Sequence, residues 1–189
     1  ILVVNNKLEI LYRYDKEKLV PFGEILPLNN FFEKLGLKKI TQGYGSFSSG
    51  KNQNNFKLNN LSILPLICYE IIYSGNLTKN TEFDFIINIS EDAWFGQSIG
   101  PHQHFTKAIY RAIEEGVFIA RSANKGISVF INPNGKVIKS LNTGEPGNIE
   151  LNFPYFFKPT LFSKYGNKIF FLIILLYIFL TLIFKKFKI

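Results

Sequence analysis

The sequence predicts a sandwich of helices and strands, α/β or α+β, followed by one helix long enough to cross a membrane. Short apolar runs bounded by turn residues recur along the first 150 residues and indicate strands. Residues 104–116 carry apolar side chains at helical spacing instead. Residues 169–184 contain no charge, glycine or proline. Strands mixed with helices favour packed layers over an all-β domain.

The composition excludes several classes of protein. Of the 189 residues, 47% are hydrophobic, which is enough for a core and excludes wholesale disorder. The net charge of +8 comes from scattered lysines, and the densest run, KKFK at 185–188, follows the apolar segment. That placement is typical of membrane topology and argues against nucleic acid as a partner. The single cysteine excludes an internal disulfide framework and a cysteine-based zinc cluster.

The first third of the chain predicts strands joined by polar loops. Residues 1–14 read as two strands with a turn between them, and the prolines and glycine of 19–28 indicate a structured loop. Residues 29–36 resemble a short capped helix that ends at glycine. Residues 41–60 are rich in Gly, Ser and Asn, which favours a loop or an exposed hairpin, and their composition permits a mobile lid.

The middle of the chain predicts two buried strands and two helices. Residues 61–67 form an apolar strand, although Pro65 argues against a central place in a sheet. A helix is expected to begin near Glu70, and residues 83–90 predict a second buried strand. The helix over 104–116 has an apolar face with these members: Phe105, Ala108, Ile109, Ala112 and Ile113.

Four further strands and a membrane helix complete the prediction. The strands are expected at 117–123, 127–133, 134–140 and 147–153, with a turn at Pro133-Asn134-Gly135. Residues 153–168 are a linker, 169–184 the membrane helix and 185–189 a basic tail.

The segment 169–184 is apolar around its whole circumference, which favours a membrane span over a buried core helix. At 1.5 Å per residue it spans about 24 Å, somewhat short of a hydrocarbon core of about 30 Å. Lysines at both ends can extend to the headgroups, so spanning remains feasible. The lysines mildly favour a cytoplasmic C-terminus.

The stretch LPLICYE places Cys68 between an apolar run and the expected helix. A thiol at that position is either a small core residue or a nucleophile presented on a turn. A nucleophile there gains from the helix N-terminus, which lowers the pKa of a thiol, and from backbone N–H groups that stabilise an oxyanion. The strand–cysteine–helix pattern leaves both readings open.

Two lysines and two glutamates are candidates to assist that thiol. Lys16 follows a strand and precedes a Pro/Gly loop, and Lys18 competes with it on spacing alone. Glu24 and Glu70 are candidate acid–base groups or side chains that orient the lysine.

A third stretch, NISEDAWFGQSIGPHQH, holds two aromatic residues and both histidines. Trp94 and Phe95 lie in an expected glycine-bounded loop, where they either anchor the core or pack the loop. His102 and His104 alternate in the same expected loop without metal-ligand spacing to carboxylates, so no metal site is expected.

Four motifs in order resemble the carbon–nitrogen hydrolase (nitrilase) superfamily and, within it, the apolipoprotein N-acyltransferase family. They are YRYDKEKLVPFGE, LPLICYE, NISEDAWFGQSIGPHQHFTKAIYRAIEEG and RSANKGIS, and the resemblance covers about residues 8–131. It implies a nitrilase-like αββα sandwich over 1–152, incomplete at its N-terminus. The apolar segment at the C-terminus agrees with the final membrane helix of that family.

The family uses a Glu–Lys–Cys triad, and motif matching implies a role for each candidate residue. Its lysine falls on Lys16, in the pattern Tyr-x-Lys-x-x-Leu, and its nucleophile on Cys68. Accessory glutamates fall on Glu24 and Glu70, and Tyr69 is the tyrosine after the nucleophile.

Two features depart from the family's pattern. In the aromatic loop, where Trp94 and Phe95 are implied to line the lipid entrance, Glu91 replaces the usual asparagine. The triad glutamate falls before Ile1, and the chain contains no methionine. We therefore expect the chain to be the C-terminal part of a longer enzyme and inactive by itself.

The resemblance implies transfer of an acyl chain from a phospholipid to the diacylglyceryl-cysteine of apolipoproteins, through a thioester on Cys68. It implies no metal or organic cofactor, a bacterial inner membrane, a periplasmic catalytic domain and a cytoplasmic tail. One alternative is an amidohydrolase of the same superfamily, although a soluble amidase gives no reason for the segment 169–184. The other is a non-catalytic, membrane-anchored remnant of the enzyme.

Overall fold

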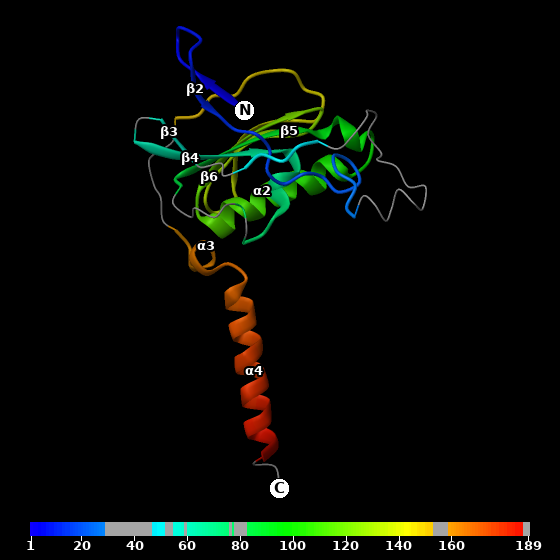
Figure 1. The fold of residues 1–189 in the computed structure, drawn as a ribbon, viewed down its shortest axis with the longest axis vertical. Helices are drawn as coiled ribbons and strands as arrows, with labels where there is room; N and C mark the ends of the chain where they lie inside the picture. The colour runs from blue at the N-terminus through cyan, green and yellow to red at the C-terminus, as the bar shows by residue number, and fades with distance from the viewer. Residues whose placement is uncertain are drawn as a thin grey trace.

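The computed structural model describes a layered domain from which one long helix projects (Figure 1). The described residues are 1–28, 47–51, 55–58, 60–75, 77, 83–152 and 159–186. The helix expected over 29–36 lies outside them, and so does half of the segment 41–60 with the expected lid, namely residues 41–46, 52–54 and 59. Within that segment, Phe56–Leu58 forms strand β3, in agreement with the hairpin alternative.

A six-stranded sheet in chain order forms the centre of the domain. Its strands are β3, β4 (Leu61–Ile67), β5 (Phe85–Glu91), β6 (Phe118–Asn124), β7 (Ser128–Ile131) and β8 (Val137–Leu141). The central strands β4, β5 and β6 are parallel, and the outer pairs are antiparallel. Parallel strands present their carboxyl ends at one edge of the sheet, so Cys68 after β4 and Asp92 after β5 emerge together.

Strand β4 lies inside the sheet despite Pro65. On one side, Pro65 pairs in register with Ile87 of β5. On the other side, β3 reaches only to Ile63, so Pro65 lies beyond its last pair. The missing N–H of proline is therefore tolerated where the neighbouring strand has ended.

Helix α2 (Gly100–Glu115) covers one face of the sheet. It begins four residues earlier than expected, because Pro101 is compatible with a first helical turn. The two histidines expected in a loop therefore lie in the helix. The buried face also differs, since Ile113 is 45% exposed. The side chains buried along α2 beyond its first turn are His104, Ala108, Arg111, Ala112 and Glu115.

The opposite face of the sheet packs against a hairpin of β1 (Leu2–Val4) and β2 (Ile10–Arg13). The ring of Tyr12 stacks on Phe56 with a centroid distance of 5.0 Å. Strand residues alternate between the two faces, so Ile86 points to α2 while Phe85 points to the hairpin. Helix, sheet and hairpin form three successive layers of the expected sandwich.

Two expected elements differ from the structure. The helix after Cys68 is η1 (Cys68–Ile72), a single short 3-10 helix that ends at an extended Tyr73. The strand expected over 147–153 is absent from its described part, 147–152. The expected turn before β8 is present, since Gly135 has φ 77° and donates its N–H to Asn132 O at 2.9 Å.

Two helices follow the sheet. Helix α3 (Leu161–Tyr165) lies in the expected linker and contacts α2, and α4 (Lys168–Lys186) extends away from the sheet (Figure 1). Among the described residues, α4 is the one helix that is long and apolar enough to cross a membrane, and none of its apolar window is buried.

The junction between α4 and the domain rests on two glycines. Gly75 and Gly166 adopt φ 63° and 52°, and a β-carbon on Gly75 would lie 3.2 Å from Gly166 Cα. Beside them, Ser74 donates its hydroxyl to Glu114 at 3.0 Å, and Asn167 Nδ2 donates to Ser74 O at 3.4 Å. The base of α4 is thereby tied to the segment that follows η1.

Candidate active site

Cys68 occupies a strained turn between β4 and η1. Its φ is 53°, in the left-handed region that a residue with a β-carbon adopts at a cost of about 1–3 kcal/mol. A sharp strand-to-helix turn of this kind projects its side chain above the sheet edge, as in a nucleophile elbow. The side chain is partly exposed. The geometry favours a presented thiol over a buried core residue.

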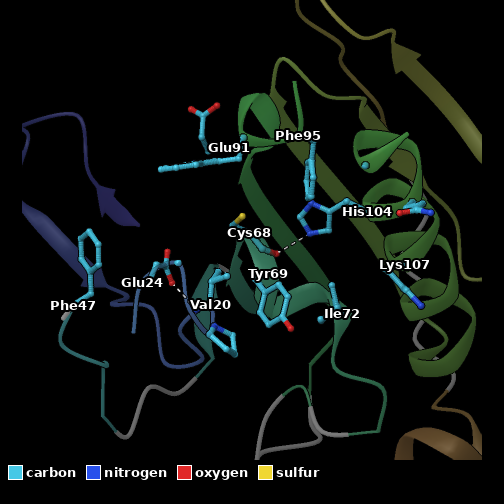
Figure 2. Close-up of a pocket in the computed structure, with 15 residues that line it drawn as sticks. Val20, Glu24, Phe47, Cys68, Tyr69, Ile72, Glu91, Phe95, His104 and Lys107 are labelled. Carbon is cyan, nitrogen blue, oxygen red and sulfur yellow. Dashed lines mark hydrogen bonds between the residues drawn. The ribbon is translucent and has the colours of Figure 1, made fainter. Parts of the chain in front are cut away.

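The thiol opens into a cavity of about 570 Å³ (Figure 2). Tyr69, Trp94, Phe95 and Glu24 all line this cavity with Cys68. Its other apolar walls come from Val20, Pro21, Phe47 and Ile72. Trp94 is 68% exposed, whereas Phe95 packs edge-on against His104 with a centroid distance of 5.7 Å. A largely apolar cavity with a few polar groups suits a substrate that carries an aliphatic chain.

Lys16 and Lys18 have different surroundings. Lys16 Nζ lies 2.7 Å from Glu24 Oε1, and its side chain is 11% exposed. Glu24 Oε2 accepts the N–H of Val20 at 2.8 Å, which holds the carboxylate in place. Lys18 Nζ instead lies 4.6 Å from the Tyr73 ring centroid and donates to Leu77 O at 3.3 Å. Lys16 is therefore the lysine that is joined to the cavity wall.

Glu70 ties the Lys16 loop to the Cys68 turn. Its side chain is 1% exposed, and it accepts the hydroxyl of Tyr14 at 3.0 Å. Its carboxylate also accepts the N–H groups of Glu17 at 2.8 Å, Lys18 at 3.0 Å and Ile67 at 2.7 Å. Glu70 thus holds the main chain beside Lys16, while Glu24 holds the ammonium itself.

The stability that the Tyr14 hydroxyl contributes to this cluster decreases at alkaline pH. Burial, and then the Glu70 carboxylate, raise the pKa of Tyr14 above its ordinary value of 10.0. Above that pH the unfolded chain loses the proton and the folded protein keeps it. This contribution to the unfolding free energy is therefore present below pH 10.0 and falls by about 1.4 kcal/mol per pH unit above it.

We expect Tyr14→Phe to flatten the loss of stability above pH 10, because the variant has no proton to retain. At neutral pH it should be less stable by about 1–2 kcal/mol through loss of the bond to Glu70. Denaturant unfolding at several alkaline pH values measures both effects. Tyr110→Phe, at a side chain 51% exposed, is the control. An unchanged alkaline slope in Tyr14→Phe would contradict the assignment.

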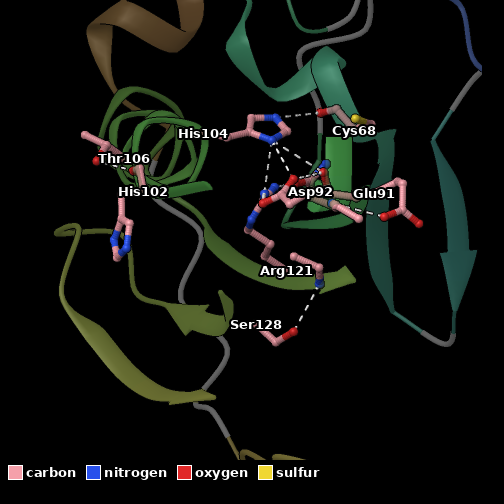
Figure 3. A network of polar contacts seen from close by, with 12 residues as sticks. Cys68, Glu91, Asp92, His102, His104, Thr106, Arg121 and Ser128 are labelled. Atoms are coloured by element: carbon pink, nitrogen blue, oxygen red, sulfur yellow. Dashed lines mark hydrogen bonds and ion pairs between the residues drawn. The ribbon is translucent and has the colours of Figure 1, made fainter. Parts of the chain in front are cut away.

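A buried polar network lies beneath the turn and was missed by sequence reasoning (Figure 3). Asp92 Oδ2 lies 2.7 Å from Arg121 Nη2, and Asp92 Oδ1 lies 2.9 Å from His104 Nδ1. Ser90 donates its hydroxyl to Asp92 at 2.7 Å, and Arg121 also donates to Asn88. The one sign of this network in the sequence was the charged Arg121 inside a mostly apolar expected strand, because a buried charge requires a partner of opposite charge.

Burial alone would raise the pKa of Asp92. Hydrogen bonds from His104 and Ser90 and the charge of Arg121 outweigh burial and lower it below its ordinary value. Asp92 therefore stays ionised, and burial lowers the pKa of Arg121 against the opposing effect of Asp92. Gly126 is required here, because a β-carbon on it would overlap the Asp92 carboxylate.

Glu91 uses its carboxylate as a local cap. It precedes η2 (Asp92–Phe95), and its Oε1 accepts the N–H of Ala93 at 3.1 Å. Asn124 Nδ2 donates to Oε2 at 2.7 Å.

Within the described part of the chain, no group of three His, Cys, Asp or Glu side chains is placed to hold a metal ion. The assembled groups, a thiol, an ammonium and carboxylates, suit acyl transfer.

A family model described as carbon-nitrogen hydrolase matches residues 1–151. The chain is 40% identical over 169 residues to an apolipoprotein N-acyltransferase of Bradyrhizobium diazoefficiens, covering 88% of this chain and 32% of that protein. It is 43% identical over 189 residues to the Rickettsia prowazekii protein of the same name, with coverages of 96% and 37%. The chain thus spans about a third of the length of these curated relatives.

Solved structures with a similar fold are amidases and nitrilase-superfamily proteins. One is an amidase from Nesterenkonia sp. AN1 with acrylamide added at its active-site cysteine, with a TM-score of 0.53 and 18% identity over 76% of this chain and 52% of that one. Another is Saccharomyces cerevisiae Nit3, with a TM-score of 0.52 and 17% identity over 75% and 48%. The predicted nitrilase-like architecture is confirmed.

Proposed function

The chain belongs to the carbon-nitrogen hydrolase family, and from that premise we propose that it forms part of the catalytic centre of an apolipoprotein N-acyltransferase. The proposed reaction moves an acyl chain from a phospholipid to the diacylglyceryl-cysteine of an apolipoprotein. The observation that carries the proposal is Cys68 on its strained turn, open to an apolar cavity. The identity of about 40% to proteins of that name supports the same reaction.

The first half-reaction would acylate the cysteine. A general base, which the family resemblance places before Ile1, takes the proton of Cys68, and the thiolate attacks the ester carbonyl carbon. The Lys16 ammonium and the N–H of Tyr69 stabilise the tetrahedral oxyanion. The carbon–oxygen bond then breaks, the alcohol oxygen takes the proton, and a thioester and a lysophospholipid result.

The second half-reaction would transfer the acyl chain to the amine. The α-amino group of the diacylglyceryl-cysteine attacks the thioester, the carbon–sulfur bond breaks, and the amine proton returns to the sulfur, which gives ping-pong kinetics. Glu24 orients Lys16 at 2.7 Å, and Glu70 fixes the turn that carries Cys68. Trp94 and Phe95 line the entrance for the chain.

We place α4 across the bacterial inner membrane, where both lipid substrates are found. Its length and apolar surface support a span. Lysine near its C-terminal end favours a cytoplasmic tail and thus a periplasmic catalytic domain.

An amidohydrolase is the second candidate, because the similar solved structures include amidases. Their identity of about 18% supports the fold only. An exposed helix suited to a membrane favours the acyltransferase over a soluble amidase. A non-catalytic anchored remnant would give neither reaction.

The test is to incubate the protein at its natural length, in mixed micelles, with phosphatidylethanolamine and to measure its intact mass. We expect an acyl adduct that maps to Cys68 and is released by neutral hydroxylamine, as a thioester is. Adding a synthetic diacylglyceryl-cysteine peptide should discharge it as an amide. Hydrolysis of small amides without an acyl adduct would support the amidase, and no reaction with either substrate would support the remnant.

A further inference from the structure

The carbonyl oxygen of Cys68 is held by a buried histidine. His104 Nε2 lies 3.2 Å from Cys68 O, and the His104 residue is 5% exposed. A carbonyl oxygen only accepts, so Nε2 carries the proton of this hydrogen bond. Figures 2 and 3 show the sulfur of Cys68 pointing away from the imidazole and the carbonyl oxygen pointing toward it. His104 therefore binds the main chain of the candidate nucleophile and leaves its thiol free for the cavity.

Holding this carbonyl also fixes the N–H of the next residue. A peptide bond is planar and trans, so the C=O of Cys68 and the N–H of Tyr69 point in opposite directions. His104 and Glu24 lie on opposite sides of Cys68 (Figure 2). With the carbonyl toward His104, the Tyr69 N–H faces the side of Glu24, where Lys16 is bound. That N–H lies in the first turn of η1, where a helix offers it no acceptor.

The imidazole is itself fixed from behind. Its Nδ1 lies 2.9 Å from Asp92 Oδ1, 3.2 Å from Arg121 Nη2 and 3.4 Å from Ser90 Oγ. Asp92 and Arg121 have fully buried side chains joined at 2.7 Å. Partners on Nδ1 set the orientation of the ring and thus the direction of Nε2. The network supports a defined contact with the nucleophile turn.

We propose that His104 is a positioning residue that orients the Cys68–Tyr69 peptide, so that the Tyr69 N–H and the Lys16 ammonium meet at one oxyanion site. The inference deepens the proposed acyl transfer and rests on it. Cys68 has a φ of 53°, a strained backbone conformation that persists only when surrounding groups hold it in place. Glu70 holds the main chain on the N-terminal side of the turn by accepting the Ile67 N–H. His104 holds it on the C-terminal side by binding the Cys68 carbonyl.

Two amide variants separate this role from a structural one. In His104→Gln the side-chain amide reaches the position of Nε2 and can still donate to Cys68 O. In His104→Asn the shorter amide overlaps only Nδ1, so the donor is lost while polarity is kept. His102→Asn, at an exposed position on the same helix, is the control.

Each variant, in the protein at its natural length, is reacted with two probes of Cys68. A p-nitrophenyl ester of a medium-chain fatty acid acylates sulfur through an oxyanion and releases p-nitrophenolate. Iodoacetamide alkylates the same sulfur by direct displacement of iodide, without an oxyanion. We expect His104→Asn to slow acylation at least about tenfold and alkylation by less than about threefold, since loss of an oxyanion donor costs about 100-fold or more. His104→Gln and the control should stay within about threefold of the unaltered protein in both reactions.

The proposal is overturned if His104→Asn acylates normally, if both reactions slow together, or if Gln is as slow as Asn. Because the activated ester replaces the phospholipid, the inference is tested separately from the proposed function. Acylation of the unaltered protein by the ester but not by phosphatidylethanolamine would reject the lipid substrate and leave the role of His104 measurable.

Discussion

Replacing Cys68 by alanine is expected to abolish acyl transfer, with a loss of at least about 10⁴-fold, because the substitution removes the one thiol of this chain and with it the thioester. The fold should remain, since the side chain is partly exposed and fills little of the core. Intact mass after incubation with phosphatidylethanolamine, together with thermal unfolding, measures both effects. An acyl adduct on the alanine variant would place the nucleophile elsewhere.

Cys68→Gly is the matched variant, because it also lacks the thiol but relieves the backbone. Glycine adopts a φ of 53° without steric cost, whereas alanine carries the same strain as cysteine. We expect the glycine variant to be more stable than the alanine variant by about 1 kcal/mol, the reverse of the usual order. The usual order, with alanine more stable, would show that the turn stores no strain.

Replacing Glu70 by glutamine is expected to lower the unfolding free energy by about 3 kcal/mol and to slow acylation of Cys68. The carboxylate accepts from Tyr14, Glu17, Lys18 and Ile67, and an amide presents a donor to groups that are themselves donors. With a side chain 1% exposed, water cannot replace the lost acceptor. Denaturant unfolding and the rate of acylation by the p-nitrophenyl ester are the measurements.

Glu24→Gln is the control, since it removes the other glutamate of the site. Its side chain is 26% exposed and makes an ion pair with Lys16, so stability should change by less than about 1 kcal/mol. Acylation should slow all the same, because Lys16 loses the group that orients it. Equal losses of stability in the two variants would refute separate roles for the two glutamates.

The central strands were predictable from the sequence as short apolar runs bounded by turn residues, but their parallel pairing was not, and Pro65 argued against the place that β4 occupies. Strand β4 is a nearly continuous apolar run, whereas β5 and β6 carry polar residues among their apolar ones, such as Asn88 and Arg121.

The start of α2 was not predictable in the same way. Glycine and proline are typical of loops, and only the structure shows that Gly100 and Pro101 form the first turn of the helix. Its buried face includes His104 and Arg111, which a count of apolar residues assigns to the surface.

Motifs and topology contributed different parts of the candidate site. Short motifs pointed to Lys16, Glu24, Cys68 and Glu70. The structure places Cys68 and Glu24 in the cavity lining, joins Lys16 to Glu24, and ties the Lys16 loop to the Cys68 turn through Glu70. The pairing of Asp92 with Arg121 and of His104 with the Cys68 carbonyl depends on which strand lies beside which. Local sequence does not contain that adjacency, so the network emerged only from the fold.

If α4 lies in a bilayer as proposed, the contact between Gly75 and Gly166 affects how far the catalytic domain lies from the membrane. A β-carbon added to Gly75 would lie only 3.2 Å from Gly166 Cα, so the absence of side chains at these two positions lets the segment after η1 lie close against the base of α4. The height of the Cys68 sulfur relative to the bilayer then depends on this short junction. Such a protein would select its substrate by depth, because Cys68 would reach ester bonds at one level of the leaflet and not those above or below it.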